Sequence, residues 1–532
     1  MSQASFSLHP ALADMRDFFS EAAARPERTV LVMAATGEAH SAGAVAEGAL
    51  QLAQWLGRQG LQTGERFAIV LENRIEIVQL VLAARHAGLY ATVISTHLTP
   101  EETAYIVQDS SARLVLGSDR TWAQLDRVRS TLDLPCWNLD TQGQPDALHD
   151  ALQAMQGEDI DFSARPMGRD LLYSSGTTGQ PKGVLQPLYP AELRDQMLPE
   201  ALRTAALMGM GPDTVYLSPA PLYHAAPLRY TLRVLDLGGQ VVIMDGFDPE
   251  QALALIERYR VTHSQWVPTM FGRMLQLPQE TRQRHDLSSH RVAIHAAAPC
   301  PAPLKQAMLD WWGDILVEYY AGSEGCGVTT INSQEWRQRP GSVGRATTGE
   351  LRILDEDGQL LPPGEVGMVY FEGGPSFSYL GDEEKTRQAI NERGWATYGD
   401  LGHVDEDGYL FLSDRRADLI LSGGVNLYPQ EIENALIGHP DVREVAVVGV
   451  PDPDLGELAA AVIVLQARAE PDIATAHAIV EHAQLSRIKR PRRVVFVESL
   501  PRLATGKLLR RELKQQLREQ PDSGFDLRAP AS

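Results

Sequence analysis

The first half of the chain alternates helical patterns with short apolar runs, and this alternation limits the fold more than any other feature of the sequence. Apolar spacing over 44–57 and 75–87 predicts amphipathic helices. Runs such as Phe67–Leu71 are typical of buried strands. Parallel neighbours need a crossover connection, so this alternation predicts parallel sheets covered by helices. The predicted strands are 67–71, 90–94, 112–117, 214–217, 240–244 and 292–295.

The chain is too long to fold around one core, and its pattern changes twice toward the C-terminus. At 532 residues it should form at least two domains. Beyond Arg345, short strands alternate with Asp-Gly and Pro-Gly turns, which predicts a small β-subdomain at about 345–415. A polar break and a new α+β pattern follow. We therefore predict an α/β fold with a large N-terminal domain of parallel or mixed sheets with helices, 1–415, and a small, mobile α+β C-terminal domain, 416–532.

Composition and charge exclude several classes of protein. The net charge of −21 argues against nucleic acid or an anionic membrane as the main partner. No apolar run approaches the roughly 20 residues of a membrane span, and the N-terminus lacks the pattern of a signal peptide. Cys136, Cys300 and Cys326 have no metal-ligand spacing and fit a reducing compartment. We expect a cytoplasmic protein, and the sequence is compatible with a homodimer without predicting one.

A loop rich in hydroxyl groups and glycine follows the predicted strand at 170–173. Its glycines let backbone N–H groups approach phosphate oxygens, and Lys182 adds a positive charge. A Walker A loop is excluded, because Pro181 precedes Lys182 where glycine is required and Gly183 follows it where serine or threonine is required. We predict a triphosphate-binding loop formed by Ser174, Ser175, Gly176, Thr177, Thr178, Gly179 and Lys182.

This loop resembles the phosphate loop of the adenylate-forming (ANL) superfamily, which joins a carboxylate to AMP before passing the acyl group on. The resemblance extends over roughly residues 20–515, and the wording of its segments is most similar to bacterial fatty-acid and bile-acid CoA ligases. It implies an acyl-CoA synthetase that uses ATP, Mg²⁺, coenzyme A and a carboxylic acid. The further segments that carry the resemblance are 221–227, 318–324, 394–400, 421–433 and 501–507.

The resemblance implies roles around the nucleotide. Tyr320 would stack against adenine, and Ser323 would bind the α-phosphate. Glu324 and Thr177 would bind Mg²⁺, and Asp400 and Arg415 would hold the ribose hydroxyls. Two departures stand in these segments: Ala321 replaces the usual glycine, and Tyr398 replaces the usual threonine.

The resemblance also implies roles at the reacting carboxylate and thiol. His224 would line the carboxylate site, and Lys507 would contact the carboxylate and the α-phosphate. Gly423 and Gly424 would leave a passage for the pantetheine arm. The family commonly has Asp or Lys as its domain hinge where this chain has Ala417, so the residue that turns is left open.

The acyl group is less constrained than the chemistry. The segment around His224 has no aspartate to hold an ammonium group, so an α-amino acid is not expected. Several alanines, at 225, 226 and 296–298, leave room for a bulky apolar acid, either a fatty acid or a steroid side-chain acid. An aryl-CoA ligase, a carrier-loading enzyme, a luciferase-like oxidative enzyme and a non-catalytic binding protein stay open as alternatives. The sequence does not decide between free coenzyme A and a carrier protein, nor does it name the acid or the pathway.

Overall fold

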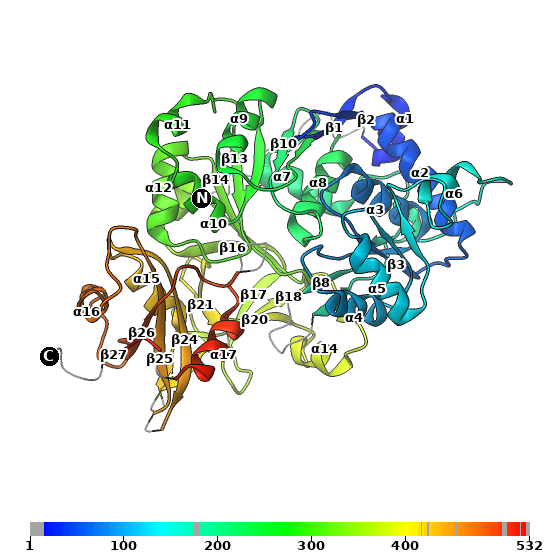
Figure 1. Ribbon diagram of the computed structural model, residues 1–532. Helices are drawn as coiled ribbons and strands as arrows, with labels where there is room; N and C mark the ends of the chain where they lie inside the picture. The colour runs from blue at the N-terminus through cyan, green and yellow to red at the C-terminus, as the bar shows by residue number, and fades with distance from the viewer. Residues whose placement is uncertain are drawn as a thin grey trace.

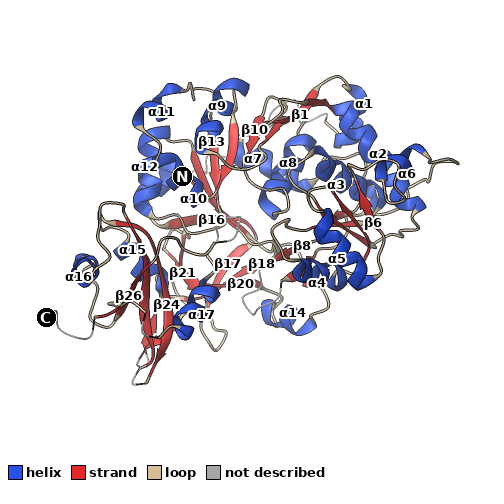
Figure 2. Cartoon of the chain, viewed as in Figure 1, coloured by secondary structure: helices blue, strands red, loops and turns tan. Residues whose placement is uncertain are grey.

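The described residues form four β-sheets and the helices that cover them. The computed structural model describes residues 15–174, 181–415, 418–422, 425–453, 455–502, 508–521 and 523–527. Figure 1 shows two helix-covered regions side by side, with the C-terminal sheet below one of them. Figure 2 shows the helices on the outer faces of the sheets. This arrangement confirms the predicted α/β fold. No helix of the described residues is long and apolar enough to cross a membrane.

A five-stranded parallel sheet in the order β6-β5-β3-β4-β7 forms the first region. Alternate residues of its central strand face opposite sides: Phe67 and Ile69 pack in one core, and Ala68 and Val70 in another. Both faces are therefore buried. The strands are β3 (Arg66–Val70), β4 (Tyr90–Val93), β5 (Ala112–Gly117), β6 (Cys136–Asn138) and β7 (Arg169–Asp170), and the helices are α1 (Phe18–Ala24), α2 (Ala42–Arg58), α3 (Ile75–Ala87), α4 (Pro100–Asp109), α5 (Trp122–Leu132) and α6 (Leu148–Gln153).

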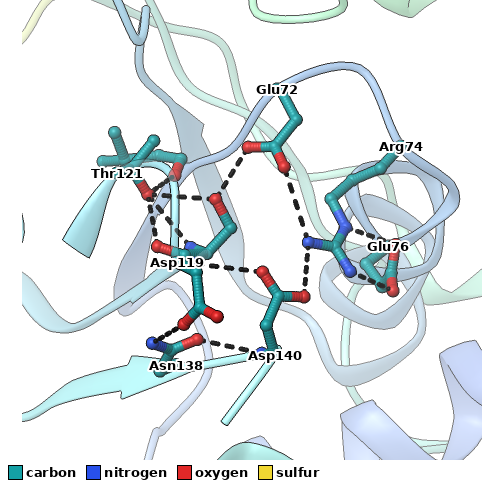
Figure 3. Close-up of polar contacts among 9 residues, drawn as sticks. Glu72, Arg74, Glu76, Asp119, Thr121, Asn138 and Asp140 are labelled. Atoms are coloured by element: carbon teal, nitrogen blue, oxygen red, sulfur yellow. Dashed lines mark hydrogen bonds and ion pairs between the residues drawn. The ribbon is translucent and has the colours of Figure 1, made fainter.

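Polar side chains brace the carboxyl end of this sheet (Figure 3). Arg74, which follows β3, donates to Glu76 at 2.8 Å and to Asp140 at 2.9 Å. The other carboxylate oxygen of Asp140 accepts the backbone N–H of Asp119, which follows β5, at 3.0 Å. Asn138 at the end of β6 donates to the Asp119 side chain at 2.9 Å. The loops after three neighbouring strands are thereby fixed to one another, and their carboxylates are used within the brace.

The largest sheet has thirteen strands in the order β17-β18-β20-β21-β16-β15-β14-β13-β12-β10-β11-β1-β2. Pairing is parallel from β11 through β14 and antiparallel from β14 to β17, so the residues of the predicted β-subdomain continue the same sheet. Its strands are β1 (Thr29–Met33), β2 (Ala39–Ser41), β10 (Val215–Ser218), β11 (Gln240–Ile243), β12 (His263–Trp266), β13 (Val292–His295), β14 (Leu316–Tyr320), β15 (Val328–Asn332), β16 (Ser342–Thr348), β17 (Glu350–Leu354), β18 (Gly367–Glu372), β20 (Ala396–Val404) and β21 (Leu410–Arg415).

Helices and a small sheet connect the two regions. A three-stranded sheet in the order β19-β9-β8 flanks the segment predicted to bind phosphate. The helices are α7 (Pro199–Met208), α8 (Ala225–Asp236), α9 (Pro249–Tyr259), α10 (Pro268–Leu275), α11 (Gln279–Arg284), α12 (Ala302–Trp312), α13 (Ser333–Gln338) and α14 (Glu383–Ala389), and the strands are β8 (Leu172–Ser174), β9 (Lys182–Leu185) and β19 (Ser378–Tyr379).

The C-terminal sheet has its own hydrophobic cores. Val447 of the long strand β24 faces one core, whereas Ala446 and Val448 face the other. All buried members of these two cores lie at or after Ile420. The boundary between 415 and 416 stays a prediction. The elements are β22 (Ile420–Ser422), β23 (Val425–Leu427), β24 (Val442–Asp452), β25 (Gly456–Leu465), β26 (Arg493–Phe496), β27 (Phe525–Asp526), α15 (Pro429–Leu436), α16 (Ile473–His482) and α17 (Arg510–Glu519).

A buried ion pair fixes α12 against β14. Nζ of Lys305 lies 2.5 Å from Oε2 of Glu318, and their side chains are 0% and 7% exposed. Burial raises the pKa of Glu318, and the charge of Lys305 opposes that rise. Nε2 of His295 lies 3.7 Å from the same oxygen, but burial lowers the pKa of His295 well below its usual value, so its ring is neutral. Lys305 is thus the cation that balances Glu318.

Removal of Lys305 should destabilise the protein strongly. Lys305→Met leaves the Glu318 carboxylate buried without its cation, so we expect the free energy of unfolding to fall by roughly 3–5 kcal/mol. Lys305→Met combined with Glu318→Leu should recover most of the loss. Urea denaturation monitored by tryptophan fluorescence measures both variants. Arg291→Ala, which breaks an exposed pair with Asp213, is the control and should cost at most about 1 kcal/mol. An equal loss in the single and double variants would contradict the role given to the pair.

Candidate functional site

One cavity of about 2740 Å³ is lined by residues of the five-stranded sheet, the thirteen-stranded sheet and the C-terminal part of the chain. Its walls include residues of α7, α8, β14 and β20, and of α15 and α17 in the C-terminal part. Pockets for a single small ligand typically measure roughly 300–1,000 Å³. This cavity therefore has room for a nucleotide and a second substrate together. Five of the predicted site residues line it: His224, Tyr320, Ser323, Glu324 and Asp400.

The loop that carries His224 is held by a residue of the other sheet region. Asn73, which follows β3, is buried. Its Nδ2 donates to the carbonyl of Met244 at 2.7 Å and to that of Ala220 at 3.2 Å, and its Oδ1 accepts the N–H of Leu222 at 2.7 Å. Side-chain carbonyl and amide are both satisfied, so the loop is fixed two residues before His224. Asn73 could not be predicted from the sequence, because its partners lie 147–171 residues away along the chain.

His224 itself is a neutral ring at the start of α8. Its Nε2 is buried and has no hydrogen-bond partner among the described residues. The ring packs edge-on against Tyr223, with centroids 4.5 Å apart. Burial, with a smaller contribution from His97, lowers the pKa of His224 to about 4. The side chain can therefore shape the cavity and offer a hydrogen bond, but it does not carry a positive charge at neutral pH.

The segment after β14 is packed against β20 at the predicted nucleotide site. The hydroxyl of Tyr320 donates to Oδ2 of Asp400. Tyr398, which replaces the threonine expected by resemblance, donates to the carbonyl of Gly327 at 2.7 Å and accepts its N–H at 3.0 Å. The Cα atoms of Asp400 and Arg415 are partners in the β20–β21 pairing, so the two predicted ribose-binding positions are neighbours.

Glu324 is a buried carboxylate with one oxygen committed to the protein. Oε1 accepts from the hydroxyl of Tyr379 at 2.8 Å, and the backbone carbonyl accepts from Gln186 at 2.7 Å. Oε2 has no hydrogen-bond partner among the described residues. The described residues contain no cluster of three or more metal ligands. One available carboxylate oxygen fits Mg²⁺, which is commonly held by one or two carboxylates, substrate phosphates and water.

Two lysines interact with Asp382, and one of them, Lys385, also lines the cavity and interacts electrostatically with Glu324. Nζ of Lys182 is 2.9 Å from Oδ2 of Asp382, and this contact raises the pKa of Lys182. Nζ of Lys385 lies 4.4 Å from the ring centre of Tyr379. Burial lowers the pKa of Lys385, and the negative charge of Glu324 opposes this shift. Lys182 was predicted from its loop, whereas Tyr379 and Lys385 were not, because the hydrogen bond of Tyr379 and the electrostatic interaction of Lys385 with Glu324 join distant segments.

Arg229 links the strand before the phosphate loop to the segment of Ser323. Its Nε and Nη2 lie 3.0 Å and 2.8 Å from Oδ2 of Asp170, and its Nη1 donates to the carbonyl of Ser323 at 3.1 Å. Burial would raise the pKa of Asp170, but Arg229 and Arg169 lower it. Arg229 thus uses its three nitrogens within the protein as a buried brace.

Several predicted site residues lie outside the described part of the chain, so the structure does not place them. The side chains of Ser174 and Arg415 belong to this group, although their backbones are described in β8 and β21. The residues that are not described at all are Ser175, Gly176, Thr177, Thr178, Gly179, Ala417, Gly423, Gly424 and Lys507.

Comparison with known families identifies two matching models. Residues 18–378 match the family of AMP-binding enzymes. Residues 431–507 match the C-terminal domain of AMP-binding enzymes. The first match alone covers more than half of the chain, and it includes β8, β14 and α8 of the cavity.

Individual proteins are similar over nearly the whole length. The long-chain-fatty-acid–CoA ligase FadD13 of Mycobacterium tuberculosis is 32% identical over 86% of this chain and 89% of its own. The 2-succinylbenzoate–CoA ligase of Geobacillus kaustophilus is 32% identical over 88% of this chain and 91% of its own. The crystal structure of ATP-bound MatB from Rhodopseudomonas palustris matches with a TM-score of 0.82 and 29% identity, and covers 95% of this chain and 99% of that one.

The neutral state of His224 can be measured. Its pKa in the folded protein is about 4, whereas an unfolded histidine titrates near ~6.5. As the pH falls from 6.5 toward 4, the unfolded state therefore binds the proton first, and the contribution of His224 to stability declines. Burial also lowers the pKa of His263 to about 4, so NMR titration of ¹³C-labelled histidines should show more than one signal with a midpoint near pH 4, and the signal of His224 is the one that disappears in His224→Asn. A midpoint near 6.5 for that signal would disprove the buried neutral state.

Gly322 tests whether the Glu324 segment must approach β20 closely. A Cβ atom at this position would lie 2.5 Å from Oε2 of Glu324 and 2.5 Å from ring carbons of Tyr398. Both distances are shorter than van der Waals contact, so Gly322→Ala should displace Glu324 and weaken ATP binding at least about tenfold, or ~1.4 kcal/mol. Calorimetric titration with Mg·ATP measures this effect. Gly246→Ala is the matched control, because a Cβ there meets no atom within 4 Å. Unchanged ATP affinity in Gly322→Ala would refute the need for close approach.

Proposed function

The chain belongs to the family of AMP-binding enzymes and is an AMP-forming acid–CoA ligase, and from this premise we propose how its cavity performs the reaction. In the first step a carboxylate oxygen of the acid attacks the α-phosphorus of ATP. The bond from that phosphorus to the β-phosphate oxygen breaks, and pyrophosphate leaves. In the second step the sulfur of coenzyme A attacks the acyl carbon and AMP leaves. The observation that carries this proposal is the convergence of His224, Tyr320, Glu324 and Asp400 on one cavity.

The first step needs positioning and positive charge more than proton transfer. A carboxylic acid with a pKa near ~4 is already ionised at neutral pH, so no general base is required. The barrier comes from bringing two anions together and from charge on the phosphate, which fixed cations reduce. We assign Lys507 to the carboxylate and the α-phosphate, and the segment from Ser174 through Thr177 to Lys182 to the departing pyrophosphate. The ion pair of Arg229 with Asp170 supports the start of that segment.

Glu324 is proposed as the protein ligand of Mg²⁺. Its Oε1 is oriented by Tyr379, which leaves Oε2 for the cation, and the predicted second ligand is Thr177. When bound, Mg²⁺ would neutralise negative charge on the phosphate oxygens. The neutral ring of His224 complements this arrangement on the acyl side, since it lines the carboxylate site without adding a competing charge.

The nucleoside is proposed to lie between β14 and β20. The ring of Tyr320 is partly exposed and lines the cavity, so it offers a flat surface to adenine. Its hydroxyl holds Asp400, and Asp400 is paired in register with Arg415. A carboxylate in this position can accept hydrogen bonds from both ribose hydroxyls.

The second step requires a different lining of the same cavity. A thiol with a pKa near ~8.5 is mostly protonated at neutral pH and must reach the acyl carbon directly. We propose that the C-terminal domain turns near Ala417 between the two steps, so that Gly423 and Gly424 replace Lys507 at the acyl-adenylate. Cavity-lining residues on α15 and α17 support this view, because they place the C-terminal part at the cleft.

The acid itself is proposed to be bulky. The related ligases are named for a long-chain fatty acid and for 2-succinylbenzoate, so aliphatic and aryl acids are both represented among them. Ala225, Ala226 and the segment 296–298 line the cavity, which supports a wide acyl pocket near His224.

Lys507 should separate the two half-reactions. We expect Lys507→Ala to lower pyrophosphate release by roughly 10²–10³-fold, as for loss of one group that stabilises transition-state charge. Conversion of preformed acyl-adenylate to acyl-CoA should be largely spared. The assay follows pyrophosphate and AMP over a panel of carboxylic acids, with and without coenzyme A.

Two outcomes of that assay would overturn the proposal. Release of ADP and orthophosphate would exclude adenylate formation. An equal loss of both half-reactions in Lys507→Ala would exclude the role given to this lysine. Lys489→Ala, which removes a lysine paired with Glu431 on the C-terminal surface, is the control and should leave both rates unchanged.

A further inference from the structure

One face of α8 carries charged residues along the cavity wall. Arg229, Arg233 and Asp236 follow His224 on this helix, and all four line the cavity. Arg229, Arg233 and Asp236 recur at spacings of four and three residues, which places these three on the same side of the helix. The part of the cavity wall that follows Ala225 and Ala226 on α8 is therefore charged, which was not predicted from the sequence.

Most arginines of this wall are already paired. Arg229 is 2.8 Å from Asp170, and Arg85 is 2.6 Å from Asp236. The first pair joins α8 to β7, and the second joins α8 to α3. The charges of these two arginines are balanced by Asp170 and Asp236. They are not available for a ligand without breaking a buried ion pair, which is costly.

Arg233 differs from these neighbours. Its guanidinium lies 5.5 Å from the ring centre of Tyr230. No hydrogen bond or ion pair of this side chain is found among the described residues, although the residue is only partly exposed. Because Arg233 also lines the cavity, an anion bound there could accept several of its five N–H groups at once.

The surroundings of Arg233 do not neutralise it. Tyr230 packs against Tyr216 and Tyr319, with ring centres 6.2 Å and 5.9 Å apart. Gln265 donates to the hydroxyl of Tyr319 at 2.9 Å and accepts from that of Tyr216 at 3.2 Å. Burial raises the pKa of Tyr319 to about 12 and that of Tyr230 further, so these tyrosines are uncharged. The group is a neutral aromatic wall with one unbalanced cation.

We propose that Arg233 binds a second carboxylate at the far end of the acid, so that the enzyme prefers dicarboxylic over monocarboxylic substrates. The inference rests on the proposed function, because it takes the carboxylate near His224 as the one that is activated. Arg233 lies nine positions after His224, the N-cap of α8, which corresponds to a rise of about 14 Å along the helix. A bulky acid extending along this face would bring its distal group to the guanidinium while its stem contacts Ala226 and Tyr230.

Paired substrates and one matched pair of variants test the proposal. Decanoate and decanedioate share a chain and differ at the distal end. For the wild-type enzyme, kcat/KM of acyl-CoA formation should be higher with decanedioate. Arg233→Gln, which removes the charge but keeps a polar side chain, should lower kcat/KM for decanedioate about 10- to 100-fold and leave that for decanoate nearly unchanged. Arg233→Lys should retain part of the preference.

Arg258→Gln is the control variant. Arg258 also lies in the last turn of its helix, α9, and over a tyrosine ring, with its guanidinium 5.1 Å from the centre of Tyr259. It is exposed and does not line the cavity, so this variant should not change either substrate. An equal loss with both acids in Arg233→Gln, or no loss with decanedioate, would overturn the proposal.

Calorimetry separates this proposal from the proposed function. If no carboxylic acid of the panel, these two included, caused release of pyrophosphate from ATP, the proposed function would be wrong. Titration of decanedioate and decanoate into the wild-type protein and Arg233→Gln then decides on Arg233 alone. A selective loss of decanedioate binding supports the anion site, and identical binding to both proteins overturns it.

Discussion

The site depends on strand β14, where parallel pairing gives way to antiparallel pairing in the large sheet. Its parallel partner is β13, and its antiparallel partner is β15. Inside, Glu318 is anchored by Lys305, and two residues later Tyr320 reaches Asp400 across the sheet. The segment that leaves β14 carries Ser323 and Glu324 into the cavity. A shift of this strand would therefore move the proposed adenine, ribose and phosphate contacts together.

Hydrophobic periodicity along the sequence correctly predicted several helices and strands whose residues follow a regular apolar pattern. The helix at 75–87 and the strands at 112–117 and 292–295 have the boundaries expected from the sequence. Strand β12 was not predicted, because His263, Ser264 and Gln265 carry polar groups, and each of them also has a hydrogen-bond partner far away along the chain. The union of the parallel and antiparallel strands in one sheet could not be predicted either, since it depends on pairing between segments far apart in the chain.

The site, too, contains residues that the sequence could predict and residues that it could not. Resemblance named the residues of contiguous motifs, and five of them line one cavity. It could not reveal Asn73, which holds the His224 loop, or Tyr379, which orients Glu324. It could not reveal the ion pair of Arg229 with Asp170 in the cavity wall either, or the hydrogen bond of Arg229 to the Ser323 carbonyl. These contacts are set by tertiary packing, and a single sequence contains no spacing that marks them.

The ion pair between Lys182 and Asp382 reduces the affinity that Lys182 can add to nucleotide binding in the proposed site. In the proposed site, a phosphate that binds Lys182 first has to displace the Asp382 carboxylate from this lysine. Entry is then an exchange of one anion for another, with a smaller net gain in affinity than a new ion pair would give. When pyrophosphate leaves the proposed site, Asp382 can form its ion pair with Lys182 again. An internal competitor of this kind favours turnover over tight retention of the leaving group.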